Sequence, residues 1–146
     1  MPHVHPLRVY YEDTDFSGVV YHSNYLKYFE RAREHLIGPA ELVRLWKEEG
    51  VGFVVYRVEM GFREGAVFGD ELEILTTVKL ESEYRATFRQ QVFRAGARGN
   101  APMVDGKVEL VCVNREQRLV PLPAHVAASI RTFVAEGPLA SGGGRV

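Results

Sequence analysis

The chain is poor in cysteine and has no excess of either charge, and each shortage excludes classes of protein. Cys112 is the single cysteine in 146 residues, so an internal disulfide is impossible and a cysteine-built metal site lacks a second thiolate. Lys and Arg number 18 against 19 Asp and Glu, which gives no general attraction to nucleic acid or anionic lipid. We expect no nucleic-acid partner, and a local group of cations must meet any anionic ligand.

Long apolar runs are missing as well. No stretch reaches about 18 apolar residues, and MPHVHPLRVYY at the start lacks the basic region and apolar run of a secretory signal. These features predict a cytoplasmic protein without membrane insertion. Cys112 lies in the strand-like VELVCVN, which predicts a small buried side chain rather than a nucleophile. His3 and His5 are expected to be solvated residues near the terminus, and no metal site is expected.

The length predicts one domain, which we assign to residues 1–134, followed by a flexible Gly-rich tail over 135–146. Within the domain, Tyr25, Phe29, Ala32 and Leu36 recur at intervals of four, three and four residues. This stripe predicts an amphipathic helix that begins near His22 and ends before Gly38-Pro39. Two shorter helical segments are expected over residues 40–49 and 124–134.

Strand-like runs account for most of the remaining chain. They cover residues 7–11, 53–63, 72–80, 85–94 and 104–114. Gly69-Asp70 and the GARGN of residues 96–100 predict chain reversals, so the strands should be antiparallel. A long antiparallel sheet that curls around one long helix gives an α+β fold. Such a sheet leaves edge strands exposed, and we expect a homodimer, or a tetramer built from dimers, to protect them.

The segment YYEDTDFSGVVYHSNYLKYFERARE, residues 10–34, carries the chemistry. Asp15 precedes His22 by seven residues, so a folded-back loop can place its carboxylate beside the N-terminus of the long helix. The free N–H groups there stabilise negative charge. A carboxylate opposite such donors is what acyl transfer requires, and it favours hydrolysis of an ester or thioester.

Two other interpretations of this segment stand beside the first. Asp13, Thr14, Ser17 and Gly18 are common in turns and caps, where they serve local hydrogen bonding alone. DTDFSG also matches the first half of an EF-hand loop, but the twelfth position is Asn24 rather than a bidentate Glu, which argues against calcium. From the chemistry alone, the capping and catalytic interpretations both remain open.

The same residues also carry a resemblance to a known family. DTDFSGVVYHSNY, followed by a helix that ends in ERARE, resembles the signature of hotdog-fold acyl-CoA thioesterases, in the branch of 4-hydroxybenzoyl-CoA thioesterase and the YbgC-type enzymes. FGDELEIL of residues 68–75 is also similar, so the resemblance covers roughly residues 6–125. It implies a hotdog fold and hydrolysis of acyl-CoA without a cofactor, since CoA is part of the substrate.

The resemblance implies roles for individual residues. Asp15 matches the catalytic carboxylate, and Asp13 matches a position that shapes the loop. The backbone N–H of His22, with that of Tyr21, is expected to hold the oxyanion. The His22 side chain either assists proton transfer or only shapes the pocket. Gly18 and Val19 of the loop are assigned to substrate binding.

The remaining substrate contacts are less strongly indicated. Phe53, Tyr56 and Met60 on the second strand are candidates to line the acyl pocket, as is Val54. The basic cluster that contacts CoA phosphates in the hydroxybenzoyl enzymes is replaced here by Ser82-Glu83-Tyr84, which leaves Arg85 as the candidate phosphate ligand. The alternative function is a hotdog domain that binds acyl-CoA or an acyl carrier protein without turnover.

Overall fold

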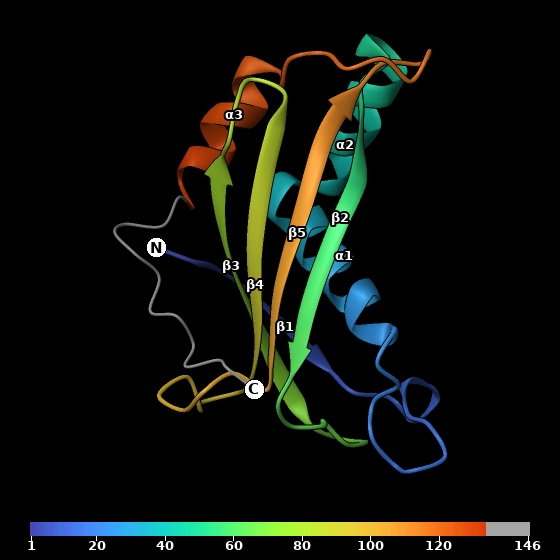
Figure 1. The fold of residues 1–146 in the computed structure, drawn as a ribbon, viewed down its shortest axis with the longest axis vertical. Helices are drawn as coiled ribbons and strands as arrows, with labels where there is room; N and C mark the ends of the chain where they lie inside the picture. The colour runs from blue at the N-terminus through green and yellow to red at the C-terminus, as the bar shows by residue number, and fades with distance from the viewer. Residues whose placement is uncertain (134–146) are drawn as a thin grey trace.

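The computed structural model describes residues 1–133, which form one antiparallel sheet with a long helix across one face (Figure 1). The strands, in the order in which they lie in the sheet, are β1 (His3–Arg8), β3 (Glu71–Leu80), β4 (Arg85–Arg94), β5 (Val104–Val113) and β2 (Gly52–Phe62). All neighbouring strands are antiparallel. The α+β class and the five antiparallel strands expected from the sequence are confirmed. The proposed tail, 135–146, and residue 134 lie outside the described residues.

The helices are α1 (Asn24–Ile37), α2 (Pro39–Arg44), which continues into the π-helical turn η2 (Leu45–Glu49), and α3 (Ala124–Arg131). A single turn of 3-10 helix, η1 (Tyr11–Asp13), precedes the loop of interest. Gly38, with a φ of 105°, ends α1 as the sequence indicated. Among residues 1–133, no helix combines the length and apolarity needed to cross a membrane.

The apolar stripe of α1 forms the core of the molecule against the sheet. Tyr25, Phe29 and Ala32 are at most 2% exposed, and so are the facing sheet residues Ile74 and Val92. The helix lies so close to the sheet that a Cβ on Gly106 of β5 would overlap the Phe29 ring. Glycine is therefore required at position 106, and the predicted packing of helix on sheet is confirmed. Cys112 is fully buried on β5, and burial raises the pKa of its thiol to about 11, as expected for a structural side chain.

The first strand differs from the prediction. It runs from His3 to Arg8 rather than over residues 7–11, and Tyr11 belongs to η1. Register with β3 explains the difference, because His3, His5 and Leu7 lie opposite Thr76, Ile74 and Leu72 and share the helix-facing side of the sheet. His3 and His5 are therefore half-buried, and the expectation that they are solvated was wrong. The His5 ring stacks on His35 of α1 at 4.6 Å between centroids.

We expect acid to weaken the packing of β1 on α1. Burial first, and then the neighbouring His35, lower the pKa of His3 and His5 below the ordinary 6.5. Arg31 acts on His5 in the same direction. The unfolded chain then binds these protons more readily, so the stability they contribute is present above pH 6.5 and is lost as the pH falls through the lowered values. Urea midpoints should decrease from about pH 7.5 to 5.5. The decrease should be smaller when both residues are Gln, and equal decreases would contradict this account.

Candidate active site

The loop between η1 and α1 is a tight hairpin whose two ends lie side by side. Thr14 and Val20 face each other in an antiparallel bridge, and the Asp15 N–H donates to the Val19 carbonyl at 2.8 Å. The Gly18 N–H closes the turn on the Asp15 carbonyl at 3.0 Å, with Gly18 at a φ of 89°. Only glycine adopts such a backbone readily. A bridge from Val19 to Val67 ties the hairpin to the β2–β3 loop.

Asp13 holds this hairpin against the helix. Its carboxylate oxygen Oδ2 accepts hydrogen bonds from the Tyr10 N–H and from the hydroxyl of the buried Tyr28, both at 2.9 Å. Its carbonyl accepts from the Tyr21 N–H and the Asn24 side chain, also at 2.9 Å. Burial, together with the bond to Asp13, raises the pKa of the Tyr28 hydroxyl above its usual value. These four contacts fit the loop-shaping role that the resemblance assigned to Asp13.

Asp15 presents an ionised carboxylate on the same hairpin. Its Oδ1 accepts from the Ser17 hydroxyl at 2.6 Å and from the Ser17 N–H at 2.8 Å. The Ser17 hydroxyl bond is the main reason that the pKa of Asp15 lies below its usual value, and backbone N–H groups of the loop add to it. The carboxylate is therefore charged at neutral pH. From the sequence, Ser17 was assigned to a turn but was not identified as the partner of the Asp15 carboxylate. The Asp-x-Ser spacing, in which an Asp side chain bonds the backbone two residues later, was the signal that could have indicated this contact.

The N-terminus of α1 supplies backbone donors. The helix begins at Asn24, two residues after the predicted start, because the Asn24 N–H bonds to the Tyr21 carbonyl in a tighter turn. The Tyr21 N–H, expected to hold an oxyanion, already donates to Asp13. The N–H groups of His22 and Ser23 make no hydrogen bond within the described residues. Those two N–H groups are consequently the candidate oxyanion donors, and Ser23 was missed from sequence because the helix start was placed too early.

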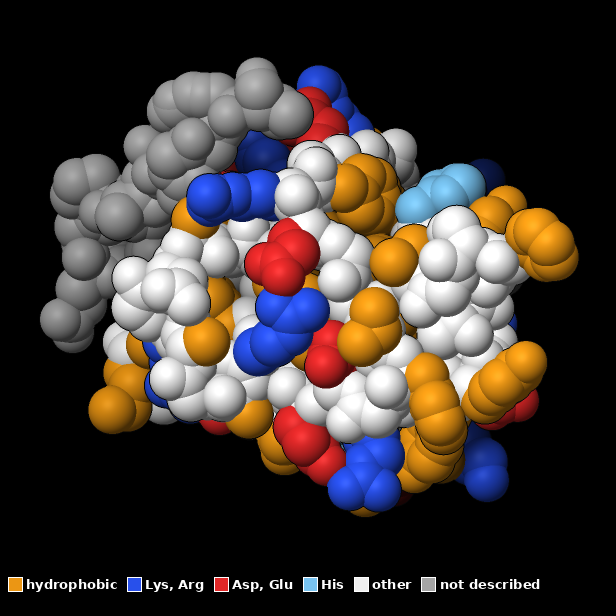
Figure 2. Space-filling model, turned by 90° about the horizontal axis from the view of Figure 1, so that it is seen from below, with side chains coloured by type: hydrophobic (Ala, Val, Ile, Leu, Met, Phe, Trp, Pro, Cys, Tyr) orange, Lys and Arg blue, Asp and Glu red, His pale blue; other side chains and the backbone are white. Residues whose placement is uncertain are grey.

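The His22 side chain is exposed beside this helix end. Its ring tilts against Tyr21 at 4.5 Å and meets the edge of Phe62, the last residue of β2, at 6.3 Å between centroids. Figure 2 looks onto this end of the molecule and shows exposed hydrophobic side chains gathered on one side, with a His side chain among them. Tyr11, Phe16, Phe62 and Phe68 contribute exposed aromatic rings. The surroundings of His22 are thus apolar and open.

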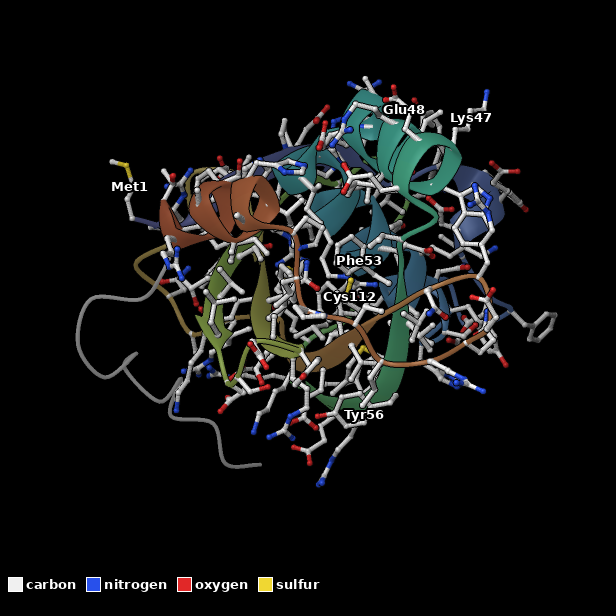
Figure 3. The ribbon with its side chains drawn as sticks, turned by 90° about the horizontal axis from the view of Figure 1, so that it is seen from above. Met1, Lys47, Glu48, Phe53, Tyr56 and Cys112 are labelled. Carbon is white, nitrogen blue, oxygen red and sulfur yellow. The ribbon has the colours of Figure 1, made fainter. Side chains whose placement is uncertain are left out.

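The predicted substrate residues divide between two places. Gly18 and Val19 lie on the hairpin, and Met60 lies toward the Phe62 end of β2. Phe53 and Tyr56 lie toward the Gly52 end of the same strand. Phe53 and Phe62 are nine residues apart on one strand, which corresponds to roughly 30 Å. Figure 3 shows Phe53 beside Cys112 on the helix side of the sheet and Tyr56 on the opposite side. One chain therefore does not bring Phe53 and Tyr56 to Asp15.

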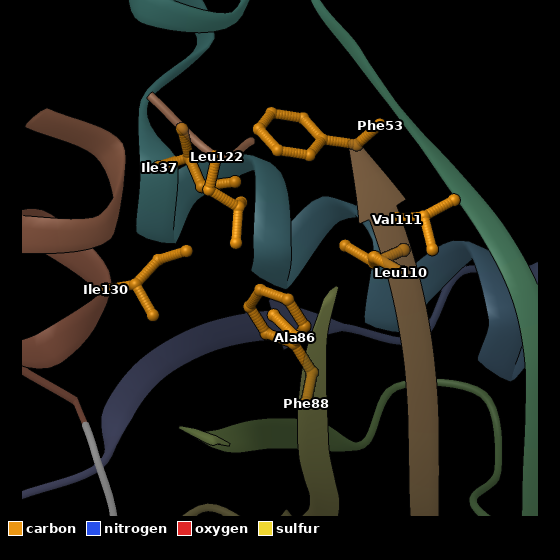
Figure 4. A pocket seen from close by; sticks show the side chains of 8 residues that line it. All are labelled: Ile37, Phe53, Ala86, Phe88, Leu110, Val111, Leu122 and Ile130. Carbon is orange, nitrogen blue, oxygen red and sulfur yellow. The ribbon is translucent and has the colours of Figure 1, made fainter. Parts of the chain in front are cut away.

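Phe53 instead lines a small apolar pocket between the sheet and the helices (Figure 4). The pocket is lined by Ile37, Phe53, Ala86, Phe88, Leu110, Val111, Leu122 and Ile130. None of these side chains carries a polar group. Within a single chain, this pocket is part of the packing between α1, α3 and the sheet, at the end opposite Asp15.

Arg85 differs from most of the basic residues that could meet CoA phosphates. Arg57 is paired with Glu59, and Arg89 with Asp105 at 2.9 Å. Arg85 contacts only the Tyr56 hydroxyl, at 3.4 Å, and has no acidic partner among residues 1–133. Its charge is available to an external anion. Among the described residues there is no group of three or more His, Cys, Asp and Glu that could hold a metal ion.

Known proteins resemble this chain along nearly its whole length. The sequence pattern of the thioesterase-like superfamily matches residues 9–130. The acyl-CoA thioester hydrolase YbgC of Escherichia coli O157:H7 is 33% identical over 132 residues, which cover 90% of this chain and 92% of the relative. The acyl-CoA thioesterase YbgC of Helicobacter pylori is 41% identical over 101 residues, covering 69% and 74%. The crystal structure of a probable thioesterase from Bartonella henselae superposes with a TM-score of 0.76 at 33% identity, covering 84% and 100%.

Proposed function

The chain belongs to the thioesterase-like superfamily, and on this premise we propose that it hydrolyses acyl-CoA to a free acid and CoA with Asp15 as the acting carboxylate. The hotdog fold expected from the sequence agrees with this membership. One observation carries the proposal: an ionised Asp15 lies on a hairpin whose ends are joined at the start of α1, where the His22 and Ser23 N–H groups have no hydrogen-bond partner among residues 1–133. That combination provides a negative group to attack and donors for the charge that develops.

The reaction needs few further groups. Asp15 either attacks the thioester carbonyl carbon, giving a mixed anhydride that water then hydrolyses, or takes a proton from the water that attacks. In both routes the carbonyl oxygen becomes negative and accepts hydrogen bonds from the two free N–H groups. The carbon–sulfur bond breaks, and CoA leaves as a thiolate that takes up a proton from solvent. Because a thiol has a pKa of about 8.5, no strong general acid is required.

A hotdog domain that binds acyl-CoA without turnover is the alternative, since a fold alone does not determine function. The two functions differ in one measurement. Purified protein mixed with acetyl-, hexanoyl- and benzoyl-CoA should release free thiol, which a thiol-reactive dye detects. Binding in calorimetry with no thiol release from any acyl-CoA would favour the binding domain.

We further propose that the active unit is a dimer formed through β2. This strand is an edge of the sheet that pairs only with β5 within residues 1–133. Its side chains Val55, Val58 and Phe62 are 37% to 43% exposed. An exposed apolar edge invites pairing with a second copy. Antiparallel pairing of two β2 strands would place the Gly52 end of one beside the Phe62 end of the other.

Such a dimer would unite the two groups of substrate residues. The partner's Phe53, on the helix-covered face, would come to the end of the sheet where Asp15 lies, and the partner's Tyr56 and the partner's Arg85 would lie near that end on the opposite face. Arg85 has a free charge for a CoA phosphate, and Tyr56, the extra residue of a β-bulge between Val55 and Arg57, already contacts Arg85. We therefore propose that Phe53 serves the acyl pocket of the other subunit, and that Arg85, with Tyr56 beside it, receives the CoA phosphates at the outer face of the paired sheet.

We expect activity on several neutral acyl-CoAs and poor activity on succinyl-CoA. No Lys or Arg lies between Asp13 and Leu26 to receive a second carboxylate. Apolar pockets separate chain lengths by only about 1 kcal/mol per methylene, whereas burying an unpaired charge should lower kcat/KM by about 100-fold. A panel of kcat/KM values tests this expectation. A preference for succinyl-CoA would contradict it and would direct attention to Arg63, which has no acidic partner among residues 1–133.

A further inference from the structure

The two oxygens of the Asp15 carboxylate have different surroundings. Oδ1 accepts both bonds from Ser17, the hydroxyl at 2.6 Å and the N–H at 2.8 Å. Both side-chain hydrogen bonds of Asp15 within residues 1–133 end on Oδ1 and none on Oδ2, although the Val19 and Gly18 N–H groups lie near enough to the carboxylate to lower its pKa further. A lone pair engaged in a short hydrogen bond is a poorer nucleophile and base, because the bond stabilises its negative charge. The two oxygens are therefore not equivalent for chemistry.

We propose that Ser17 is a positioning residue that holds Oδ1 of Asp15 and leaves Oδ2 as the oxygen that attacks the thioester or deprotonates water. This inference rests on the proposed role of Asp15. The two hydrogen bonds from Ser17 restrict rotation of the carboxylate about its Cβ–Cγ bond. Oδ2 is therefore directed away from the turn that contains Ser17. Fixed orientation of a reacting group is a large source of rate enhancement.

Charged neighbours do not provide an alternative explanation for the state of Asp15. No Lys, Arg or His within the described residues forms an ion pair with it. Asp13 on the same hairpin is engaged by Tyr10 and Tyr28. On the adjoining β2–β3 loop, Glu64 and Asp70 are both paired with Arg94. The other titratable groups on this segment are Tyr11, Glu12, Tyr21 and the exposed His22, and the charged groups Lys27 of α1 and Arg63 of the β2–β3 loop form no ion pair with Asp15. Ser17 is thus the side chain that distinguishes the two Asp15 oxygens.

Serine brings a cost as well as order. The hydroxyl bond keeps Asp15 charged at lower pH, as the direction of its pKa shows, and by the same amount it makes the carboxylate a weaker base. Position 17 therefore sets a balance between the acid tolerance of the enzyme and the reactivity of its carboxylate. Ser17 is exposed, so changing it should leave the fold intact.

The test compares Ser17→Ala with Ser17→Thr. Alanine keeps the backbone N–H but removes the hydroxyl, so Asp15 should titrate at higher pH in 13C NMR, and the acid limb of the kcat/KM profile should move the same way. A hydrogen bond to a charged group is commonly worth about tenfold. Loss of the orienting hydroxyl should therefore lower kcat at neutral pH, by about tenfold or less. Threonine retains the hydroxyl and should restore both the titration and the profile.

The outcomes separate this inference from the proposed function. If the wild type releases no thiol, or if Asp15→Asn remains active, the proposed function fails. If the wild type is active and Asp15→Asn is not, but Asp15 titrates unchanged in Ser17→Ala, only the role of Ser17 is refuted. Unchanged titration in Ser17→Ala and a higher value in Ser17→Thr would refute it equally.

Discussion

Asp15→Asn should reduce kcat/KM for acyl-CoA hydrolysis by about 10²- to 10⁴-fold, the usual contribution of an acid–base group, or more if the carboxylate is the nucleophile. The amide keeps the shape of the side chain, and its oxygen can still accept the Ser17 hydrogen bonds that Oδ1 accepts now. It carries no charge, however, so it neither attacks a carbonyl nor removes a proton from water. The loss should therefore appear in kcat, with the urea midpoint close to that of the wild type.

Asp13→Asn is the matched control on the same hairpin. Asp13 uses Oδ2 to accept from Tyr10 and Tyr28 and gives its carbonyl to Tyr21 and Asn24. The backbone carbonyl is the same in the variant, and the amide oxygen can still accept from Tyr10 and Tyr28, although without the negative charge. We therefore expect a smaller loss of activity, accompanied by a lower unfolding midpoint. Wild-type turnover in a folded Asp15→Asn protein would remove the basis of the proposed mechanism. Equal losses in the two variants would show that the assignment of the two acids is mistaken.

The elements that the sequence predicted best are those in which a repeated pattern determines burial. The stripe from Tyr25 to Leu36 placed α1 within two residues at its start, and Arg85–Arg94 was predicted with the bounds that β4 has. The first strand was misplaced because His3, His5 and Pro6 show no strand pattern. Pairing with β3, which is distant in sequence, is what makes that segment a strand.

The site was only partly predictable for a related reason. A motif can indicate that Asp15 lies near a helix N-terminus, but backbone contacts decide which N–H groups are free. The Tyr21 N–H is taken by the Asp13 carbonyl, a bond that no side-chain pattern reveals. Likewise, Phe53 and Arg85 have suitable side chains, yet strand order and direction place them at the end of the sheet opposite Asp15. Their proposed role depends on a second subunit.

Breaking the β2 edge should therefore have the second large effect. Val55→Glu together with Val58→Glu places two charges on the exposed apolar side of this strand, where a pairing partner would have to bury them. We expect the wild type to sediment as a species of twice 16.5 kDa at micromolar concentration and the double variant at 16.5 kDa. Activity of the variant should fall by about 100-fold or more, because the residues supplied by the partner leave the site.

Val43→Glu is the matched control for that experiment, since Val43 is a 53% exposed valine on α2 rather than on β2. It should change neither the mass nor the activity. Val55 and Val58 are already 40% and 37% exposed in a single chain, so the double variant should still fold. Cooperative urea unfolding would establish that it does. A wild-type monomer that hydrolyses acyl-CoA would contradict the dimer. A folded monomeric variant with full activity would show instead that one chain holds a complete site and that Arg85 and Tyr56 act elsewhere.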